Sequence, residues 1–387
     1  MTRIPLAAEQ AGGLPALTDD DRRRYARQTI LPGVGEAGQR RLRAARVLVI
    51  GAGGLGSPVI EYLAAAGVGV LGIVDDDVVE ESNLQRQIVH GVDTLGLPKV
   101  DSAAQAVARI NPTVRVEPYP VRLTADNAVD LFTRYDLIID GADNFATRYL
   151  VADAAELTGR PVVWGSILRF DGQASVFWPG HGPTYRDVFP EPPEPGAVPS
   201  CTVGGVFGVL PGMIGTVMAG EAVKLVTGVG EPLLGRLLVL DAARGVWRTL
   251  AVSVDPDRRP VERLADDYEV VCGTPGGAQG AAVTVERLAG MLAERDAGRR
   301  ALTVVDVREP AEHAAGHIPG AVNVPLSGVL DGSAALPAGP LALVCRTGVR
   351  SARALEALRA RGRADALQVI GGTLAWARRI DPTLTVV

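Results

Sequence analysis

The sequence predicts an α/β fold in two units, each built around a mostly parallel β-sheet. Short apolar, β-branched segments alternate with helix-like segments along most of the 387 residues. This alternation is typical of parallel strands joined by right-handed helical crossovers. The composition also changes at 273–282 (GTPGGAQGAA), which suits a linker between two units. A chain of this length is expected to hold two or three domains.

The first unit is expected to cover 18–270, after an N-terminal extension at 1–17. Its first strand is Arg46–Ile50 (RVLVI), which ends in a run of glycines. The alternating pattern continues to about residue 262. The later elements predicted for this unit are a helix at 57–66, a strand at 70–74, a helix at 101–110 and strands at 137–140 and 161–164.

The second unit is expected to cover 283–387, after a linker at 271–282. About 105 residues are enough for one small domain. Its predicted elements are a helix at 283–294, strands at 301–307 (ALTVVDV) and 341–344 (LALV), and a helix at 351–361.

Composition and charge exclude several classes of protein. Hydrophobic residues make up 47% and charged residues 21%, which is ordinary for a folded soluble protein and excludes a disordered chain. The net charge of −5 argues against nucleic-acid binding driven by bulk charge. The stretch 195–220 holds no charged residue, but its prolines and glycines would break a membrane-spanning helix. The N-terminus lacks the apolar core of a secretion signal, so we expect a cytoplasmic protein without a membrane anchor.

A glycine-rich turn follows the first predicted strand. Gly51, Gly53, Gly54 and Gly56 fit the G-x-G-x-x-G pattern between a strand and a helix, which suits a phosphate group at a helix N-terminus. Asp75 ends the next strand, where a carboxylate can bind ribose hydroxyls. Taken alone, this turn predicts an NAD-dependent oxidoreductase as well as it predicts an ATP-using enzyme.

The polar residues that follow favour a triphosphate over a dinucleotide. Hydride transfer needs no cluster of cations, whereas the departure of pyrophosphate builds negative charge that cations stabilise. Arg27, Arg86 and Lys99 could supply that charge, and Asp143 is a reasonable ligand for the Mg²⁺ that accompanies ATP. The candidate nucleotide-binding residues are Gly51, Gly53, Gly54, Gly56, Asp75, Ser82, Asn83, Leu84, Gln85, Arg86, Lys99, Asp143 and Asn144.

These motifs resemble the E1-like adenylyltransferases of the MoeB/ThiF family. The resemblance covers about 18–270 and rests on RYARQ at 24–28, GAGGLG, SNLQRQ at 82–87, LPKV at 97–100 and ADN at 142–144. It implies that the terminal glycine carboxylate of a ubiquitin-like sulfur carrier ending in Gly-Gly attacks the α-phosphate of Mg-ATP. It further implies that Gly54, Asp75, Asn83, Arg86, Lys99 and Asp143 hold Mg-ATP, and that Arg27 reaches into the partner's site of a homodimer.

The chain departs from the family at a metal site. Many relatives carry two C-x-x-C pairs that hold a structural zinc. Here the region of the first pair, 183–188 (PTYRDV), has no cysteine, and only Cys272 remains near the second. One cysteine cannot supply a tetrahedral zinc site, so we expect no structural zinc. The proline-rich loop at 190–199 is expected to be stiffened by its prolines instead.

Cys345 is the strongest candidate for a reactive thiol. It lies between a predicted strand and a predicted helix, where backbone N–H groups and the helix N-terminus would favour a sulfur anion. This loop, with DVRE at 306–309 and GHIPGA at 316–321, resembles the rhodanese domain over about 281–387. The resemblance implies that Cys345 carries sulfur as a persulfide, supplied by a persulfide or by thiosulfate. The persulfide loop is Cys345, Arg346, Thr347, Gly348, Val349 and Arg350.

Supporting roles are expected for several other residues. Asp306 and Arg308 are expected to stabilise the fold around the persulfide loop, and His317 to be structural. Cys201 matches a family cysteine proposed to form a thioester with the carrier or to resolve a disulfide. A small packed residue is the alternative for Cys201. Cys272 has no basic neighbours and is expected to be structural.

Three other functions stay open at this point. The chain could be an NAD-dependent dehydrogenase with an appended regulatory domain, although the cation cluster would then be unexplained. It could be a carrier-docking scaffold with an inert rhodanese domain. It could also adenylate RNA, which the net charge disfavours. The carrier and its pathway stay open too, among molybdopterin, thiamine, cysteine and secondary-metabolite sulfur.

Overall fold

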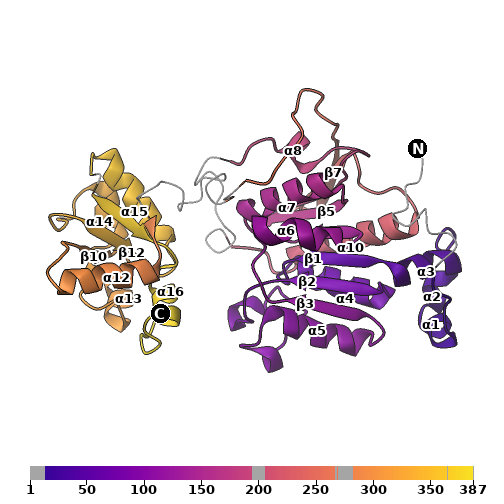
Figure 1. Cartoon of the computed structure of the whole chain (residues 1–387), viewed down its shortest axis with the longest axis horizontal. Coiled ribbons are helices and arrows are strands. Elements are labelled where there is room, and N and C mark those ends of the chain that lie inside the picture. The colour runs from indigo at the N-terminus through magenta and orange to yellow at the C-terminus, as the bar shows by residue number, and fades with distance from the viewer. Residues whose placement is uncertain (1–13, 194–204, 266–267, 269–281, 364, 387) are drawn as a thin grey trace. The chain divides into compact units, whose positions relative to one another are not determined.

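The computed structural model describes residues 14–193, 205–265, 268, 282–363 and 365–386. The chain forms two compact units, Met1–Tyr268 and Glu269–Val387 (Figure 1). Each unit has its own sheet and its own hydrophobic core.

The first unit is an eight-stranded sheet with the order β3-β2-β1-β4-β5-β6-β7-β8. The strands β1 to β5 are parallel, and β6, β7 and β8 are antiparallel additions at one side. The chain adds β2 and β3 on one side of β1 and then β4 on its other side, so the direction of winding reverses between β1 and β4. The strands are β1 (Arg46–Ile50), β2 (Val70–Val74), β3 (Arg115–Tyr119), β4 (Leu137–Asp140), β5 (Val162–Leu168), β6 (Asp171–Phe177), β7 (Arg236–Asp241) and β8 (Val246–Ala251).

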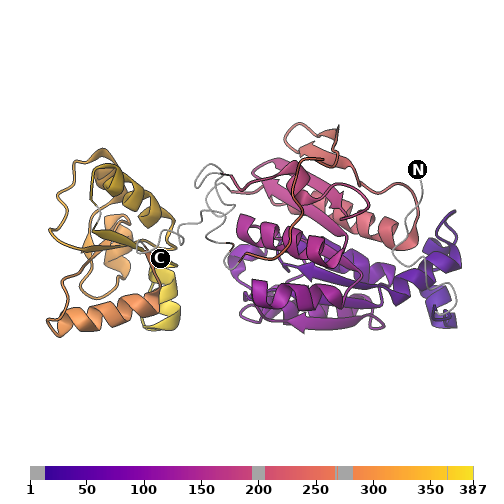
Figure 2. The same ribbon diagram turned by 45° about the horizontal axis from the view of Figure 1, so that its top comes forward.

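Helices cover this sheet (Figure 2). The helix α4 packs against α5 and α10, whereas α6 packs against α7. Val47 and Val49 of β1 lie in the core that includes Val59 and Leu63 of α4 and Ile214 of α10. The helices are α4 (Gly56–Ala66), α5 (Lys99–Ile110), α6 (Ala125–Thr133), α7 (Phe145–Thr158), α8 (Tyr185–Val188) and α10 (Leu210–Thr227), with short 3₁₀ turns η1 (Glu81–Asn83) and η2 (Val92–Thr94).

Two predicted elements of this unit are longer in the structure. The helix predicted to start at 101 starts at Lys99. The strand predicted to end at Trp164 continues to Leu168. Trp164 is the last residue of β5 that pairs with β4, but the next four residues pair with the antiparallel strand β6. The prediction of a strand end at Trp164 was wrong because the extension depends on a partner that lies later in the sequence.

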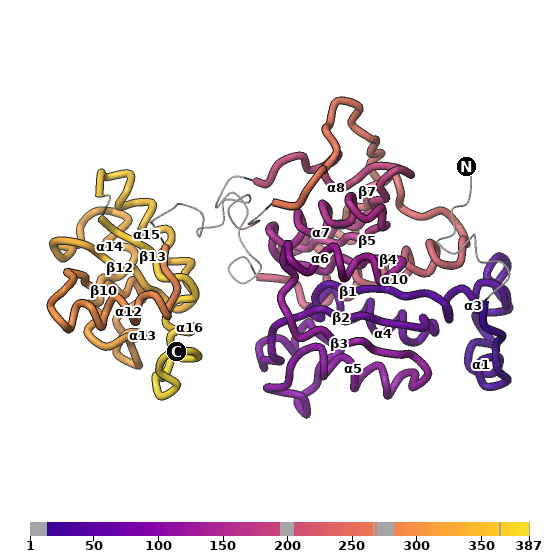
Figure 3. The backbone as a smooth tube through the Cα atoms, in the orientation of Figure 1, coloured from indigo at the N-terminus to yellow at the C-terminus, as the bar shows by residue number. Residues whose placement is uncertain are grey.

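Three short helices precede β1 and lie together beside its amino end (Figure 3). Tyr25 packs against Gly67, where a Cβ would lie 2.4 Å from the Tyr25 ring. The Tyr25 hydroxyl also accepts a hydrogen bond from Asn111 Nδ2 at 2.8 Å. Gly67 and Asn111 directly precede β2 and β3, so these contacts hold the helices at the amino edge of the sheet. They are α1 (Asp19–Arg24), α2 (Ala26–Thr29) and α3 (Gly35–Ala44).

The uncharged stretch 195–220 lies partly outside the described residues, and its second half forms the start of α10. In the described part of the chain, no helix is both long enough and apolar enough to cross a membrane.

The second unit is a five-stranded parallel sheet with the order β11-β10-β12-β13-β9. Ala282, predicted as the end of the linker, is the first residue of β9 because it pairs with Gln368 of β13. The helices α14 and α15 pack together, as do α12 and α16. The strands are β9 (Ala282–Val283), β10 (Thr303–Asp306), β11 (Val322–Asn323), β12 (Leu341–Val344) and β13 (Ala366–Val369), and the helices are α12 (Val285–Asp296), α13 (Pro310–Ala315), α14 (Leu326–Asp331), α15 (Val349–Ala360) and α16 (Gly372–Arg379).

Candidate functional site

The predicted nucleotide residues gather at the carboxyl edge of the first sheet. Gly51 follows β1, and its N–H donates to Val74 O at the end of β2 at 2.8 Å. Gly141 follows β4, and its N–H donates to Ile50 O at 3.0 Å. The glycine turn, Asp75 and the 141–144 loop therefore adjoin one another where the winding of the sheet reverses. Ligands of open α/β sheets bind in this crevice.

The glycine turn is shaped by close backbone contacts. Gly51 has φ +89°, a left-handed conformation that favours glycine. A Cβ on Gly56 would lie 1.9 Å from Gly51 O, so no other residue fits there. Gly53 differs, because a Cβ on it would meet nothing closer than Gln87 Nε2 at 3.7 Å. The backbone at Gly53 is therefore not crowded by other protein atoms, and a ligand phosphate could approach it there.

Asp75 holds the glycine turn through its carboxylate. Its Oδ2 accepts a hydrogen bond from Ala52 N at 2.8 Å, and its Oδ1 accepts one from Asp77 N at 2.9 Å. Burial raises the pKa of the Asp75 carboxyl above its ordinary value, and the Lys99 ammonium opposes that rise. Each carboxylate oxygen can accept a further hydrogen bond, so Asp75 can still bind a ribose hydroxyl.

Lys99 lies at the first position of α5 with its side chain 7% exposed. Its Nζ lies 2.8 Å from Asp77 Oδ2. Asp75, Asp76 and Asp77 bring their carboxylate oxygens within 4.8 Å of one another. The buried Lys99 ammonium is therefore paired with a carboxylate of this acidic group.

The SNLQRQ segment lies against the glycine turn. A Cβ on Gly54 would lie 3.7 Å from Arg86 O, and Gln85 lies against Gly208 just before α10. Asn83 is buried, and its Oδ1 accepts a hydrogen bond from Glu80 N at 3.2 Å. The Arg86 guanidinium donates only to Ser82 O among the described residues, at 3.0 Å. The remaining N–H groups of Arg86 are available for a phosphate.

Asp143 and Asn144 follow β4 and have different surroundings. Asp143 is exposed, and its carboxylate lies 3.4 Å from the Asn144 amide. Asn144 is the N-cap of α7, because its Oδ1 accepts a hydrogen bond from Thr147 N at 2.8 Å. Asp143 is thus free to hold a cation, while Asn144 positions the start of the helix.

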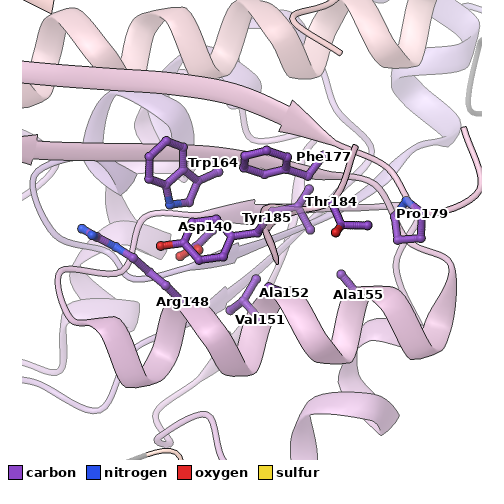
Figure 4. A pocket seen from close by; sticks show the side chains of 11 residues that line it. Asp140, Arg148, Val151, Ala152, Ala155, Trp164, Phe177, Pro179, Thr184 and Tyr185 are labelled. Atoms are coloured by element: carbon purple, nitrogen blue, oxygen red, sulfur yellow. The ribbon is translucent and has the colours of Figure 1, made fainter. Parts of the chain in front are cut away.

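Two buried residues of opposite charge, Asp140 and Arg148, hold Ala142, the residue before Asp143; Figure 4 shows their side chains. Asp140 Oδ1 accepts a hydrogen bond from Ala142 N at 3.0 Å, and Arg148 donates from Nε and Nη2 to Ala142 O at 3.2 Å each. Burial raises the pKa of Asp140 to about 6, against the effect of Arg148. Neither residue is predicted from the sequence, although a carboxylate at a buried strand end is a usable signal.

Aromatic side chains line the cavity that Asp140 and Arg148 share. Figure 4 shows Asp140 among the rings of Trp164, Phe177 and Tyr185. The Trp164 ring lies 5.9 Å from the Phe177 ring and 5.6 Å from the Tyr185 ring. Such a wall keeps water away from Asp140, which accounts for the direction of its pKa shift.

Arg27 is not brought to this site within one chain. It lies on α2, exposed to solvent, two residues after the anchor Tyr25. Because Tyr25 is held at the amino edge of the sheet, Arg27 lies at the opposite edge from the glycine turn. In this conformation Arg27 therefore does not reach a nucleotide bound at the glycine turn of its own chain.

The second unit places Cys345 directly after the central strand β12. Cys345 Sγ accepts a hydrogen bond from Gly348 N at 3.1 Å. Gly348 has φ +102°, which only glycine adopts readily, and the helix α15 begins at the next residue. Cys345 is 1% exposed, and the turn directs the backbone N–H of Gly348 at its sulfur.

The two arginines of the persulfide loop differ. Arg350 donates to both carboxylate oxygens of Glu312, at 2.6 and 2.7 Å. This pair lowers the pKa of Glu312 to about 2 and largely offsets the charge of Arg350. Arg346 is exposed, as are Thr347 and Val349. Arg346 is therefore the loop cation that is open to an incoming anion.

The turn between β13 and α16 supports the persulfide loop. Thr373 N donates to Cys345 O at 2.8 Å, and Leu374 N donates to Arg346 O at 3.0 Å. Gln368 Nε2 donates to Gly348 O at 2.8 Å. A Cβ on Gly372 would lie 2.1 Å from Cys345 O. These contacts, which the sequence analysis missed, fix the loop from the end of β13 and the start of α16.

Asp306 and Arg308 form a fully buried ion pair, as expected for residues that stabilise the fold. Arg308 Nη2 lies 2.7 Å from Asp306 Oδ2 and also donates to Gly316 O at 2.6 Å. His317 stacks on His313 with ring centroids 3.9 Å apart, and His317 Nδ1 lies 2.9 Å from His313 O. His317 is thus packed within the second unit.

The other two cysteines, Cys201 and Cys272, lie outside the described residues. Near the position where relatives carry their first cysteine pair, α8 is held by ion pairs. Arg186 donates to both oxygens of Asp153, at 2.5 and 2.9 Å, and the Tyr268 hydroxyl donates to Asp153 Oδ2 at 2.6 Å. These bonds tie α8 to α7 and to the end of the first unit.

Comparison with known families matches both units. The ThiF family model matches residues 25–260, and the rhodanese-like domain model matches residues 284–379. The chain is 50% identical over 395 residues to a probable adenylyltransferase/sulfurtransferase MoeZ of Mycobacterium tuberculosis, covering 99% of each chain. It is 41% identical over 400 residues to the adenylyltransferase and sulfurtransferase MOCS3 of Bos taurus, covering 95% of this chain and 88% of that one.

A shorter relative and a solved structure match the first unit. The sulfur carrier protein adenylyltransferase of Thermus thermophilus is 51% identical over 266 residues, which cover 66% of this chain and 98% of the relative. The crystal structure of E. coli MccB with AMPCPP and MccA aligns with a TM-score of 0.56 at 18% identity, covering 67% of this chain and 75% of that one. The fold is therefore shared with MccB. The protein belongs to the ThiF family and carries a rhodanese-like domain at its C-terminus.

Proposed function

We propose that the chain adenylates the C-terminal glycine of a ubiquitin-like sulfur carrier and then converts it to a thiocarboxylate with sulfur from a Cys345 persulfide. The proposal is supported by the names of the full-length relatives, which combine adenylyltransferase and sulfurtransferase. The observation that carries it is the presence of both sites in one chain: a phosphate-binding edge in the first unit and a thiol loop in the second.

In the first step, a carboxylate oxygen of the carrier attacks the α-phosphorus of ATP. The bond from that phosphorus to the bridging oxygen breaks, and pyrophosphate leaves with the electron pair. Lys99 and Arg86 offset the charge that develops on the phosphates, and Asp143 holds the Mg²⁺ that arrives with ATP. No general base is needed, because the nucleophile is already ionised.

In the second step, the terminal sulfur of the Cys345 persulfide attacks the acyl carbon of the adenylate. The bond from that carbon to the AMP oxygen breaks, so AMP leaves and an acyl disulfide joins the carrier to Cys345. Gly348 N and the start of α15 stabilise the sulfur anion before attack. Arg346 attracts the anionic sulfur donor that forms the persulfide, whether thiosulfate or another persulfide.

In the third step, a second thiolate attacks Cys345 Sγ. The S–S bond breaks, the carrier leaves as a thiocarboxylate, and the two thiols are oxidised to a disulfide. We assign Cys201 as the candidate for this thiol within the chain, with an external thiol as its competitor. We further propose a cytoplasmic homodimer in which Arg27 of one copy serves the nucleotide site of the other, without nucleic acid or membrane as a partner.

The test is a pair of variants assayed with a panel of small carriers ending in Gly-Gly. Asp143→Ala should abolish carrier-dependent exchange of pyrophosphate into ATP. Cys345→Ala should retain that exchange and lose thiocarboxylate formation, measured as a mass increase of 16 Da on the carrier, the difference between sulfur and oxygen. Undiminished thiocarboxylate from Cys345→Ala with a persulfide donor would refute the transfer role. Tight NAD binding without pyrophosphate exchange would refute the adenylation.

A further inference from the structure

We infer that His90 is a positioning residue for the nucleotide site, because its imidazole joins the glycine turn to the helix that carries Lys99. The inference rests on the proposed adenylation site. His90 lies three residues beyond SNLQRQ and belongs to none of the motifs that the sequence analysis singled out.

The first contact of His90 is with the glycine turn itself. His90 is 7% exposed, and its Nε2 lies 2.9 Å from Ala52 O. Ala52 stands between Gly51 and Gly53, and its N–H donates to Asp75 Oδ2. One residue of the turn is therefore held on both sides: its N–H by Asp75 and its carbonyl by His90.

The second contact of His90 is with α5. Its Nδ1 lies 2.8 Å from Ser102 Oγ, and Ser102 Oγ lies 2.8 Å from Thr94 Oγ1. Ser102 is one turn along α5 from Lys99, the first residue of that helix. The contact with Ser102 thus holds the His90 ring against α5, so that Nε2 stays directed at Ala52 O in the turn that would cradle the phosphates.

The chemistry of these partners assigns the proton. A backbone carbonyl only accepts hydrogen bonds, so Nε2 must carry the hydrogen that reaches Ala52 O. Burial lowers the pKa of His90, and the neighbouring Lys99 ammonium lowers it further. The ring is therefore neutral at physiological pH. A neutral donor orients the carbonyl without adding a charge that would compete with Lys99 for phosphate.

Removal of the imidazole should loosen the glycine turn. It would leave the carbonyl of Ala52 without its buried donor, and the carbonyl would turn toward solvent or toward the phosphates. A carbonyl oxygen directed at a phosphate is repulsive, so affinity for ATP should fall. The loss of one buried hydrogen bond with a group left unpaired corresponds to roughly a tenfold change in an equilibrium constant.

Three substitutions separate the two hydrogen bonds of His90. Gln places its amide nitrogen near the position of Nε2 and can restore the bond to Ala52. Asn places its amide near the position of Nδ1 and can contact only Ser102. Leu can make neither hydrogen bond. We expect the Kd for ATP to rise about tenfold in His90→Leu and His90→Asn, and less than about threefold in His90→Gln. His181→Leu, at an exposed histidine of the same unit, is the matched control and should leave the Kd unchanged.

The measurements are calorimetric binding of ATP to the purified full-length chain and the KM values in pyrophosphate exchange. The KM for ATP should rise, whereas the KM for the carrier should not change. Equal Kd values for the wild type and His90→Leu would overturn the inference. Equal increases in the Kd for ATP in His90→Gln and His90→Asn would also overturn it. If His90→Leu does not fold, the ratio of the Kd values of His90→Gln and His90→Asn still tests the inference. Failure of the wild type itself to bind ATP would instead refute the proposed function.

Discussion

Lys99 Nζ lies 2.8 Å from Asp77 Oδ2, so the cation that faces the nucleotide edge is already engaged by a carboxylate. Asp77 is 68% exposed at its side chain, whereas Lys99 is 7% exposed. The pair therefore sits at the mouth of the site, with the ammonium inside and the carboxylate outside. A phosphate that binds Lys99 must displace Asp77 or share the ammonium with it.

The first prediction is that Asp77→Asn binds ATP more tightly than the wild type. The substitution removes a competitor for Lys99 and a negative charge near the triphosphate, while the amide keeps the size of the side chain. A partly exposed ion pair contributes up to about 1 kcal/mol, so the Kd for ATP should fall by about two- to fivefold. Calorimetric titration of Asp77→Asn and of the wild type with ATP, at low and at moderate salt, measures this difference in Kd.

Lys99→Met is the companion variant and should raise the Kd for ATP by at least tenfold, because it removes a charge-assisted hydrogen bond. Weaker ATP binding in Asp77→Asn would contradict the competition and would indicate that Asp77 orients Lys99 productively. The difference in the Kd for ATP between Asp77→Asn and the wild type should shrink as the salt concentration rises, since salt screens the exposed Asp77 carboxylate.

The second prediction concerns Asp140, whose pKa burial raises to about 6. The unfolded chain would lose this proton near the ordinary value of 3.8. Between these pH values the native state retains a proton that the unfolded state has released, so the contribution of Asp140 to stability falls as the pH rises. A shift of about two pKa units corresponds to an upper limit of about 3 kcal/mol.

Asp140→Asn removes this titration and keeps an acceptor for Ala142 N. The free energy of unfolding of the wild type, relative to Asp140→Asn, should therefore decrease from pH 4 to pH 6.5. Denaturant unfolding followed by tryptophan fluorescence measures this difference, since Trp164 lies in the same cavity. A pH-independent difference would show that Asp140 is ionised throughout this range.

The sequence predicted the parts of the fold whose signals are local. The strands Val70–Val74, Leu137–Asp140 and Leu341–Val344 were predicted with their observed bounds, because each is a short and largely apolar run. The strand β5 was predicted too short, because its last four residues pair only with a strand that comes later in the chain.

The same distinction applies to the sites. The glycine turn and the persulfide loop have compact motifs, because backbone geometry constrains neighbouring residues together. His90 and Gln368 have no such motif. Each makes one hydrogen bond to a backbone carbonyl, at a separation of 38 residues for His90 and 20 for Gln368. A single side-chain donor facing a distant carbonyl leaves no pattern in one sequence.

The third prediction is that Gln368→Leu weakens the persulfide loop. Gln368 Nε2 donates to Gly348 O, and Gly348 N donates to Cys345 Sγ. Without the amide, Gly348 O keeps the Ser351 hydroxyl and the Ala352 N–H, both from α15, but loses the bond from β13, so the loop is held less firmly against the sheet. The N–H directed at sulfur should then stabilise the anion less.

The measurements are the rate of Cys345 alkylation by iodoacetamide at pH 7 and the lifetime of the persulfide by mass spectrometry. Both should fall about three- to tenfold in Gln368→Leu. Leu288→Val, in the core of the same unit on α12, controls for a general loss of stability. Unchanged alkylation in Gln368→Leu, with the control also unchanged, would show that the bonds from Ser351 and Ala352 suffice to fix the loop.

The fourth prediction tests whether Arg27 acts across a homodimer. Arg27 and Asp143 lie at opposite edges of one sheet, so they can meet at one nucleotide only if they come from two chains. Arg27→Ala and Asp143→Ala should each be inactive in pyrophosphate exchange. A mixed dimer of the two variants would contain one site with an intact Asp143 from its own chain and an intact Arg27 from the partner.

Equal amounts of the two variants, dissociated and reassociated at random, give half mixed dimers with one intact site each. Exchange activity should therefore recover to about one quarter of that of the wild type. Mixing Arg27→Ala with Arg27→Ala/Asp143→Ala is the control, because no combination of those chains restores a site. Absence of recovery, despite mixed dimers detected by native mass spectrometry, would place the action of Arg27 within its own chain. That result would require α2 to move away from the contacts that Tyr25 makes with Gly67 and Asn111.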